Sequence, residues 1–172
     1  MNATVESLNL LLALGGVGFI LASAVLVFDL YTSRSLEVYV QKWGLFVAFL
    51  LTATGTGMTL IYSEVFGFVP CSLCWFQRIF LYPQLFITGT ALYIKEKMVA
   101  LYGIALSVPG LIISLYQHYI QMGGSEVVGC PTGGGDCSQR ILFEFGFMTF
   151  PLVSASLFFF LIVLYFYMHK AR

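Results

Sequence analysis

The chain has 172 residues, of which 59% are apolar and only 9% are charged. A soluble domain carries about 25% charged residues and could not bury so much apolar side chain, so the composition excludes an ordinary soluble protein. Eight basic and eight acidic residues cancel, which argues against nucleic acid as a partner. The expected surroundings are a lipid bilayer.

Five apolar stretches are long enough to cross a bilayer, which takes about 20 residues of helix. They are expected at 8–28, 43–63, 75–94, 98–117 and 145–168. No basic segment precedes the first stretch, which is therefore expected to be a retained transmembrane helix rather than a signal peptide. The predicted fold is an all-α integral membrane protein with a single membrane domain over residues 1–172. Glycines of the first two spans are expected to let helices approach closely, namely Gly15, Gly16, Gly18, Gly55 and Gly57.

The basic residues predict how the spans are oriented. Six of the eight lie in the connection 29–42, in the turn 95–97 and at the C-terminus, which five spans place on one side. The positive-inside rule makes that side cytoplasmic, with the N-terminus outside and the C-terminus inside. The outer connections 64–74 and 118–144 then carry both cysteine pairs into a compartment where disulfides persist.

Cys71 and Cys74 form a Cys-x-x-Cys pair that follows Pro70. Proline suits the beginning of a helix, so Cys71 is expected in the first turn, where the helix dipole lowers the pKa of a thiol. Such a pair is typical of redox-active sites. Arg78, on the same helix face as Cys74, could stabilise a Cys74 thiolate and polarise a quinone carbonyl. The alternative for Arg78 is extension to the lipid headgroups.

Cys130 and Cys137 enclose a short glycine-rich loop. A bridge between them would be small and exposed, and is either an exchangeable disulfide or a structural staple. Gly133–Gly135 would let Cys137 move toward Cys71. Four cysteines could also bind zinc or an iron–sulfur cluster, but the spacing of the second pair and an oxidising compartment disfavour a metal. His118, ending the fourth span, is either a polar cap or a donor to a quinone oxygen.

These residues resemble the disulfide bond formation protein B (DsbB) family of bacterial inner-membrane proteins. The resemblance runs over about 42–170 and rests on Pro70-Cys71-Ser72-Leu73-Cys74 with Arg78, on Tyr116-Gln117-His118, and on Cys137-Ser138-Gln139-Arg140 followed by Gly146 and Pro151. It implies a four-helix transmembrane bundle, here with one additional N-terminal transmembrane helix. It also implies an enzyme that reoxidises a periplasmic, DsbA-like thioredoxin-fold oxidase and passes the electrons to ubiquinone or menaquinone.

The resemblance further implies a role for each cysteine. Cys130 is attacked by the thiol of the partner, Cys137 exchanges with Cys71, and Cys74 faces the quinone, assisted by Arg78 and His118. The leading helix and the short second loop depart from the best-known members. Two alternatives remain: a vitamin K epoxide reductase-like enzyme, whose second pair normally comes earlier in the chain, and a non-enzymatic membrane scaffold stapled by structural disulfides.

Overall fold

The computed structural model describes residues 3–94, 98–125 and 135–170. The helices in these ranges are α1 (Ala3–Tyr31), α2 (Glu37–Leu60), α3 (Ser72–Ile94), α4 (Val99–Gln121) and α5 (Phe150–Lys170). A π-helical turn, η1 (Ile61–Val65), continues α2, and two short strands, β1 (Phe143–Glu144) and β2 (Met148–Thr149), form an antiparallel hairpin before α5. α1, α2 with η1, α4 and α5 are long and apolar enough to cross a membrane. The prediction of an all-α integral membrane protein, a bundle with one additional N-terminal helix, is confirmed.

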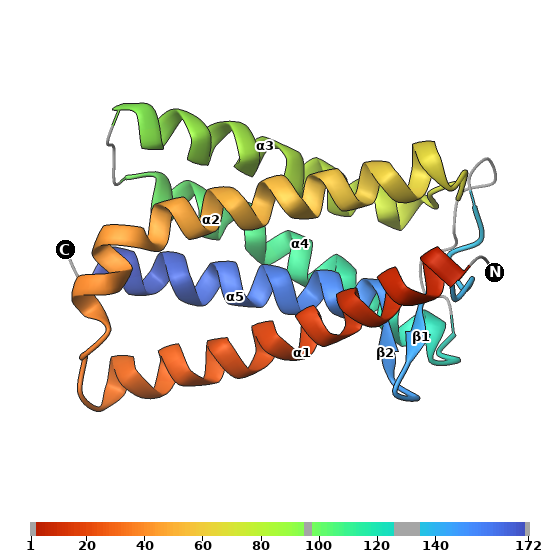
Figure 1. Ribbon diagram of the computed structural model, residues 1–172, viewed down its shortest axis with the longest axis horizontal. Helices are drawn as coiled ribbons and strands as arrows, with labels where there is room; N and C mark the ends of the chain where they lie inside the picture. The colour runs from red at the N-terminus through yellow and green to blue at the C-terminus, as the bar shows by residue number, and fades with distance from the viewer. Residues whose placement is uncertain (1–2, 95–97, 126–134, 171–172) are drawn as a thin grey trace.

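α5 is the central helix of the arrangement (Figure 1). It packs against α1, α2 and α4, while α3 packs against α2 and α4. Phe158, Leu161 and Tyr165 of α5 are completely buried. Apolarity alone does not decide this position, because lipid can also cover an apolar helix, and α1 is at least as apolar as α5 yet largely exposed. The polar side chains of α3, by contrast, face inward, because Gln77, Arg78, Gln84 and Thr88 are all buried.

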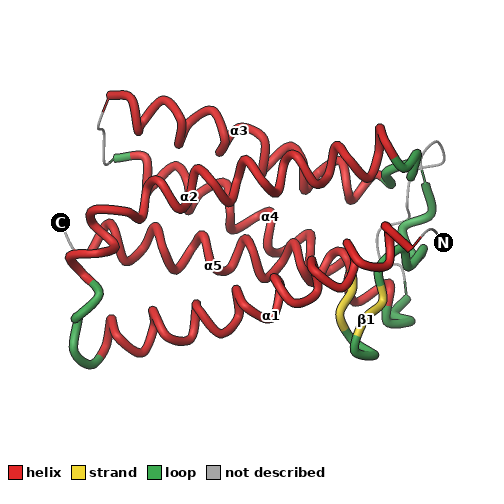
Figure 2. The backbone as a smooth tube through the Cα atoms, in the orientation of Figure 1, coloured by secondary structure: helices red, strands yellow, loops and turns green. Residues whose placement is uncertain are grey.

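The connections gather at the two ends of the bundle (Figure 2). The segment between η1 and α3 and the hairpin before α5 lie at the same end as the N-terminus (Figure 1). The loop between α1 and α2 lies at the opposite end, with the C-terminus. Both described parts of the cysteine-bearing connections therefore share one end, as the predicted topology requires. That this end is the outer one stays a prediction.

The last helix begins later than predicted. Residues 145–149 belong to the hairpin, and α5 starts at Phe150 rather than at residue 145. Phe145 and Gly146 have φ angles of 56° and 76°, which are left-handed turn conformations that a helix cannot contain. Pro151 then occupies the first turn of α5, where its missing N–H needs no partner.

Two of the five glycines allow close helix packing. A Cβ atom at Gly16 would lie 3.3 Å from the Met148 sulfur, and one at Gly55 would lie 3.1 Å from a methyl group of Leu157. At Gly15, Gly18 and Gly57 a Cβ atom would meet nothing within 4 Å. The packing prediction is therefore wrong for these three, because their side of the helix faces open space.

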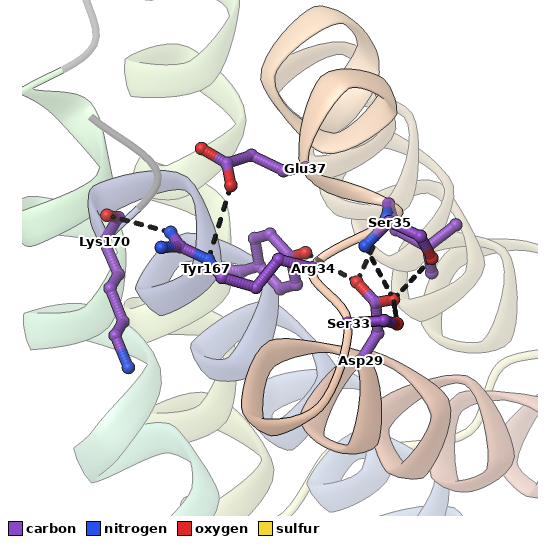
Figure 3. Close-up of polar contacts among 8 residues, drawn as sticks. Asp29, Ser33, Arg34, Ser35, Glu37, Tyr167 and Lys170 are labelled. Atoms are coloured by element: carbon purple, nitrogen blue, oxygen red, sulfur yellow. Dashed lines mark hydrogen bonds and ion pairs between the residues drawn. The ribbon is translucent and has the colours of Figure 1, made fainter.

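Asp29, in the last turn of α1, links α1 to α5 and to the loop that follows α1 (Figure 3). Its buried carboxylate accepts hydrogen bonds from the hydroxyl groups of Ser33 and Ser35 and from the backbone N–H groups of Ser35 and Leu36. The hydroxyl of Tyr167, in α5, also donates to it at 2.6 Å. These bonds close the loop between α1 and α2 and attach the end of α1 to α5. Arg34 pairs with Glu37 beside this cluster at 3.3 Å.

Candidate redox site

Cys71 occupies the position before the first residue of α3. The helix begins at Ser72, so Cys71 is its N-cap residue and not, as predicted, part of its first turn. The backbone N–H of Cys74 donates to the Cys71 sulfur at 3.4 Å, and that of Trp75 donates to the Cys71 carbonyl at 3.1 Å. A sulfur in this position replaces the oxygen of an ordinary N-cap side chain. The helix start therefore holds Cys71 through its side chain as well as its backbone.

The two sulfurs of the Cys-x-x-Cys pair lie 3.0 Å apart as free thiols, so only a small approach separates them from a disulfide. Cys71 is buried and Cys74 is partly exposed. The hydrogen bond to Cys74, together with burial, raises the pKa of Cys71. The expected lowering of this pKa is therefore not found, because the hydrogen bond with Cys74 and burial both raise it. Both causes favour the protonated, uncharged thiol at Cys71.

A pair of buried glutamines holds both sulfurs. The side-chain N–H groups of Gln117, in α4, donate to the sulfurs of Cys71 at 3.1 Å and Cys74 at 3.3 Å. Its carbonyl oxygen accepts a 2.6 Å bond from the side-chain amide of Gln77, in α3. Gln117 is 2% exposed, so this bond fixes which end of the amide faces the sulfurs. Donors in this position favour negative charge on sulfur.

Arg78 points into the bundle and not toward the lipid headgroups. Its side chain is 7% exposed, and one of its N–H groups donates to the carbonyl oxygen of Thr59, in α2, at 2.8 Å. Its guanidinium carbon lies 5.1 Å from the centre of the Trp75 ring, a cation–π contact. Because a guanidinium has five N–H donors, the bond to Thr59 leaves most of them for other acceptors.

A cavity lies beside the cysteine pair, bounded by α2, η1, α3, α4, the start of α5 and the loop after α4. Cys71, Cys74 and Arg78 line it together with Gln117. Its other walls are largely apolar and include Phe68, Pro70, Leu81, Ile141, Phe150 and Pro151. The cavity, called the redox cavity below, thus combines hydrogen-bond donors and a reactive sulfur with surfaces that suit an aromatic ring.

The described part of the second cysteine loop lies against the first pair. A Cβ atom at Gly135 would collide with the carbonyl oxygen of Val69, so only glycine allows the loop to approach the segment before Cys71 so closely. The neighbouring Asp136 lines the redox cavity, and hydrogen bonds from Ser138 lower the pKa of its carboxyl. Gly135 therefore lets the loop lie close to the segment before Cys71, whereas the sequence predicts that it makes the loop flexible.

Cys137 is disulfide-bonded and completely buried. The expectation of an exposed bridge is wrong at this end, because no part of Cys137 is exposed. Cys130, to which the family resemblance assigns contact with the protein partner, lies outside the described residues.

His118 faces a different neighbour from the adjacent Gln117. Its Nδ1 atom lies 2.8 Å from the hydroxyl of Thr149, in β2, and His118 is not among the residues that line the redox cavity. A role for His118 in quinone binding stays a prediction. Gln77 and Gln117 had been given no role, although a buried amide within an apolar span is costly enough to mark them.

Comparison with known proteins identifies relatives of most of the chain. Residues 41–168 match the family described as disulfide bond formation protein DsbB. A probable disulfide formation protein of Chlamydia caviae is 38% identical over 118 residues, which are 68% of this chain and 85% of that protein. The SPbeta prophage-derived disulfide bond formation protein B of Bacillus subtilis is 41% identical over 117 residues, 68% of this chain and 78% of that protein. No solved structure gives a significant match. α1 lies outside the family match.

Proposed function

Because this chain belongs to the DsbB family of membrane proteins for disulfide bond formation, we propose that it reoxidises a DsbA-like, thioredoxin-fold dithiol oxidase and passes the electrons to a membrane quinone. The cysteine-bearing end faces the extracytoplasmic side of a bacterial inner membrane in this proposal, and the C-terminus is cytoplasmic. The observation that carries it is the redox cavity, which places Cys74 and Arg78 in one apolar enclosure.

The lining of the redox cavity suits a quinone ring. A quinone has two carbonyl oxygens that accept hydrogen bonds on a flat apolar ring. Arg78 supplies N–H donors beside Cys74, while Leu81, Phe150 and Pro151 supply apolar surface. A bound quinone would supply the acceptor for two electrons and two protons. Whether it is ubiquinone or menaquinone depends on the ring that these walls admit.

The cysteines of the chain relay the disulfide toward this cavity. A thiolate of the partner attacks Cys130 and releases Cys137, and the second thiol of the partner then frees Cys130 and forms the disulfide of the partner. Cys137, as a thiolate, attacks Cys71 of an oxidised Cys71–Cys74 pair and forms a Cys71–Cys137 bridge. Cys74 is the leaving group and carries the electron pair as a thiolate. Cys130 then attacks Cys137 of the bridge, which restores the Cys130–Cys137 disulfide and releases Cys71. The reduced Cys71–Cys74 pair would return to the disulfide by giving two electrons and two protons to a bound quinone.

The surroundings of Cys74 favour this leaving group. Gln117 donates a hydrogen bond to its sulfur at 3.3 Å, and the positive charge of Arg78 lies in the same cavity. Both contacts lower the energy of a thiolate relative to a thiol. The contact of Gly135 with the segment before Cys71 supports an approach of the second loop to the pair.

The test uses the purified full-length chain in detergent, a reduced thioredoxin-fold dithiol oxidase and either ubiquinone or menaquinone. We expect one quinone to be reduced for each disulfide formed in the partner, and Cys74→Ser to abolish the reaction. Ser72→Ala, between the two cysteines, is the matched control and should retain turnover. Full turnover by Cys74→Ser would contradict the proposal, and no turnover by the unmodified chain would favour a scaffold stapled by disulfides.

A further inference from the structure

α1 holds two walls of the redox cavity in place, although it lies outside the family match. Asn9, in α1, is 1% exposed. Its side-chain oxygen accepts a 2.5 Å hydrogen bond from the hydroxyl of Tyr62, and its side-chain amide donates to the carbonyl oxygen of Ile141 at 3.1 Å. Tyr62 and Ile141 both line the redox cavity. α1 is therefore fixed to the bundle at this end by Asn9, and at the opposite end by Asp29.

A second cavity lies between α1, α2 and α5. Leu11, Leu12, Gly15 and Phe19 of α1 form one wall of it. The opposite walls come mainly from Leu51, Met58 and Leu157, so the lining is strongly apolar. α1 and α2 both pack against α5, and this cavity occupies the space between them. It is called the α1 cavity below.

The two cavities are adjacent. Thr59, Leu81, Phe150 and Ser154 line both of them. The α1 cavity therefore leads from the sulfur-bearing end toward the middle of the bundle. Leu11, at its edge, is 65% exposed, so the α1 cavity also borders the surface that lipid would cover.

We propose that the α1 cavity holds the isoprenoid tail of the quinone, with α1 as the wall that separates the tail from the lipid. The inference rests on the proposed function, since it needs a quinone ring in the redox cavity. An isoprenoid chain is apolar, flexible and attached to the ring, so it must leave the redox cavity through an apolar passage. In this proposal the tail passes from one cavity to the other where the four shared lining residues lie, on the side of α1. α1 thereby contributes to a binding site that the residues of the family match form only in part.

Two glycines of α1 give a matched pair of variants. A Cβ atom at either Gly15 or Gly18 would meet nothing within 4 Å, and only Gly15 lines the α1 cavity. A helical side chain leans toward the preceding turn. Phenylalanine at position 15 would therefore extend toward Leu11, at the edge of the α1 cavity, whereas phenylalanine at position 18 would extend toward Leu14, which is 52% exposed.

The experiment compares the unmodified chain, Gly15→Phe and Gly18→Phe, each with a long-chain isoprenoid quinone and with its tail-less analogue of the same ring. We expect Gly15→Phe to raise the KM for the long-chain quinone by about tenfold and to leave the KM for the tail-less one unchanged. Thermal unfolding provides a readout independent of turnover, because a bound ligand raises Tm. The stabilisation by the long-chain quinone should be lost in Gly15→Phe and kept in Gly18→Phe.

If Gly15→Phe and the unmodified chain have the same KM for the long-chain quinone and the same rise in Tm with it, the inference is overturned and the proposed function still stands. An equal rise in KM for the long-chain and the tail-less quinone would also overturn it, because the substitution would then not act on the tail. If Gly15→Phe does not fold, a long-chain quinone with a photoreactive group at the end of its tail decides the question on the unmodified chain. Labelling of residues 3–31 supports the inference, and labelling confined to α2 or α5 overturns it. No binding or reduction of any quinone would overturn the proposed function as well.

Discussion

The side-chain amide of Gln77 donates to the side-chain oxygen of Gln117 at 2.6 Å, and this bond turns the amide N–H groups of Gln117 toward both sulfurs of the cysteine pair. The two glutamines come from different helices, α3 and α4. The contact therefore couples the packing of these helices to the charge that the sulfurs can carry. Gln117 touches the reacting atoms, whereas Gln77 acts through Gln117 as a positioning residue.

Gln117→Leu should slow oxidation of the dithiol partner. Leucine keeps the volume but removes both donors to sulfur, and a lost donor to a developing charge costs about a hundred- to a thousandfold in rate. The measurement is the turnover number with saturating quinone. Gln84→Leu is the matched control, because Gln84 is a buried glutamine of α3 that does not line the redox cavity. Unchanged turnover in Gln117→Leu would show that the amide does not stabilise the sulfurs.

Gln77→Leu should also slow oxidation of the dithiol partner, but by less than Gln117→Leu does. Gln117 keeps its donors but loses the bond that orients them, so the reactivity of Cys74 toward an alkylating reagent should shift to higher pH. The pH profile of this alkylation is the measurement, because a merely structural role for Gln77 would lower stability without moving the profile. Gln77→Glu retains an acceptor but no donor, and should resemble Gln77→Leu.

Cys74 should be alkylated faster than Cys71 in the reduced protein at pH 7–8. Since the pKa of Cys71 is raised, its thiolate fraction at this pH is smaller than that of an ordinary thiol, and its sulfur is also buried. We expect a difference of about tenfold or more, measured by mass spectrometry of the two labelled forms after brief treatment with iodoacetamide. Faster labelling of Cys71 would show that Cys71, and not Cys74, has the larger thiolate fraction.

Gly135→Ala should impair transfer between the two cysteine pairs. The added methyl group would collide with the Val69 carbonyl, so the second loop would have to move away from the segment before Cys71. Partner-dependent turnover should fall, while reduction of quinone by a small dithiol that reaches Cys71 and Cys74 directly should stay unchanged. Loss of both reactions would indicate general damage to the fold instead.

Asp29→Asn should lower Tm by several degrees without changing the chemistry at the cysteines. The substitution places an NH₂ group where one oxygen accepts hydrogen bonds from backbone and hydroxyl donors, so part of the cluster is lost. Tyr167→Phe removes a single bond of the same cluster and should have a smaller effect. Thermal unfolding in detergent measures both. A fall in turnover at unchanged Tm would contradict a purely structural role.

The sequence was sufficient for the features that depend on composition and spacing. Apolar length predicts the membrane helices, and the Cys-x-x-Cys spacing predicts that Cys71 and Cys74 meet, since both properties are local. The face of Arg78 also follows from helical periodicity. The acceptor of the Arg78 hydrogen bond does not follow from periodicity, because the carbonyl oxygen of Thr59 belongs to another helix.

The features that sequence reasoning missed depend on contacts between elements. Gln117 and His118 are adjacent in the chain, yet only Gln117 lines the redox cavity, and the rotation of α4 about its axis decides this. The late start of α5 depends on a turn with positive φ at Phe145, a residue that seldom adopts this conformation. The pKa of Cys71 depends on a neighbouring sulfur, which a rule based on the helix dipole alone omits.

The bond between Asp29 and Tyr167 also has a consequence for the biogenesis of the protein. Asp29 lies in α1 and Tyr167 in α5, 138 residues later in the chain. During translation Asp29 can close its own loop through Ser33 and Ser35, but its attachment to α5 has to await the end of the chain. The bond that attaches the end of α1 to α5 is therefore one of the last contacts of the bundle to form.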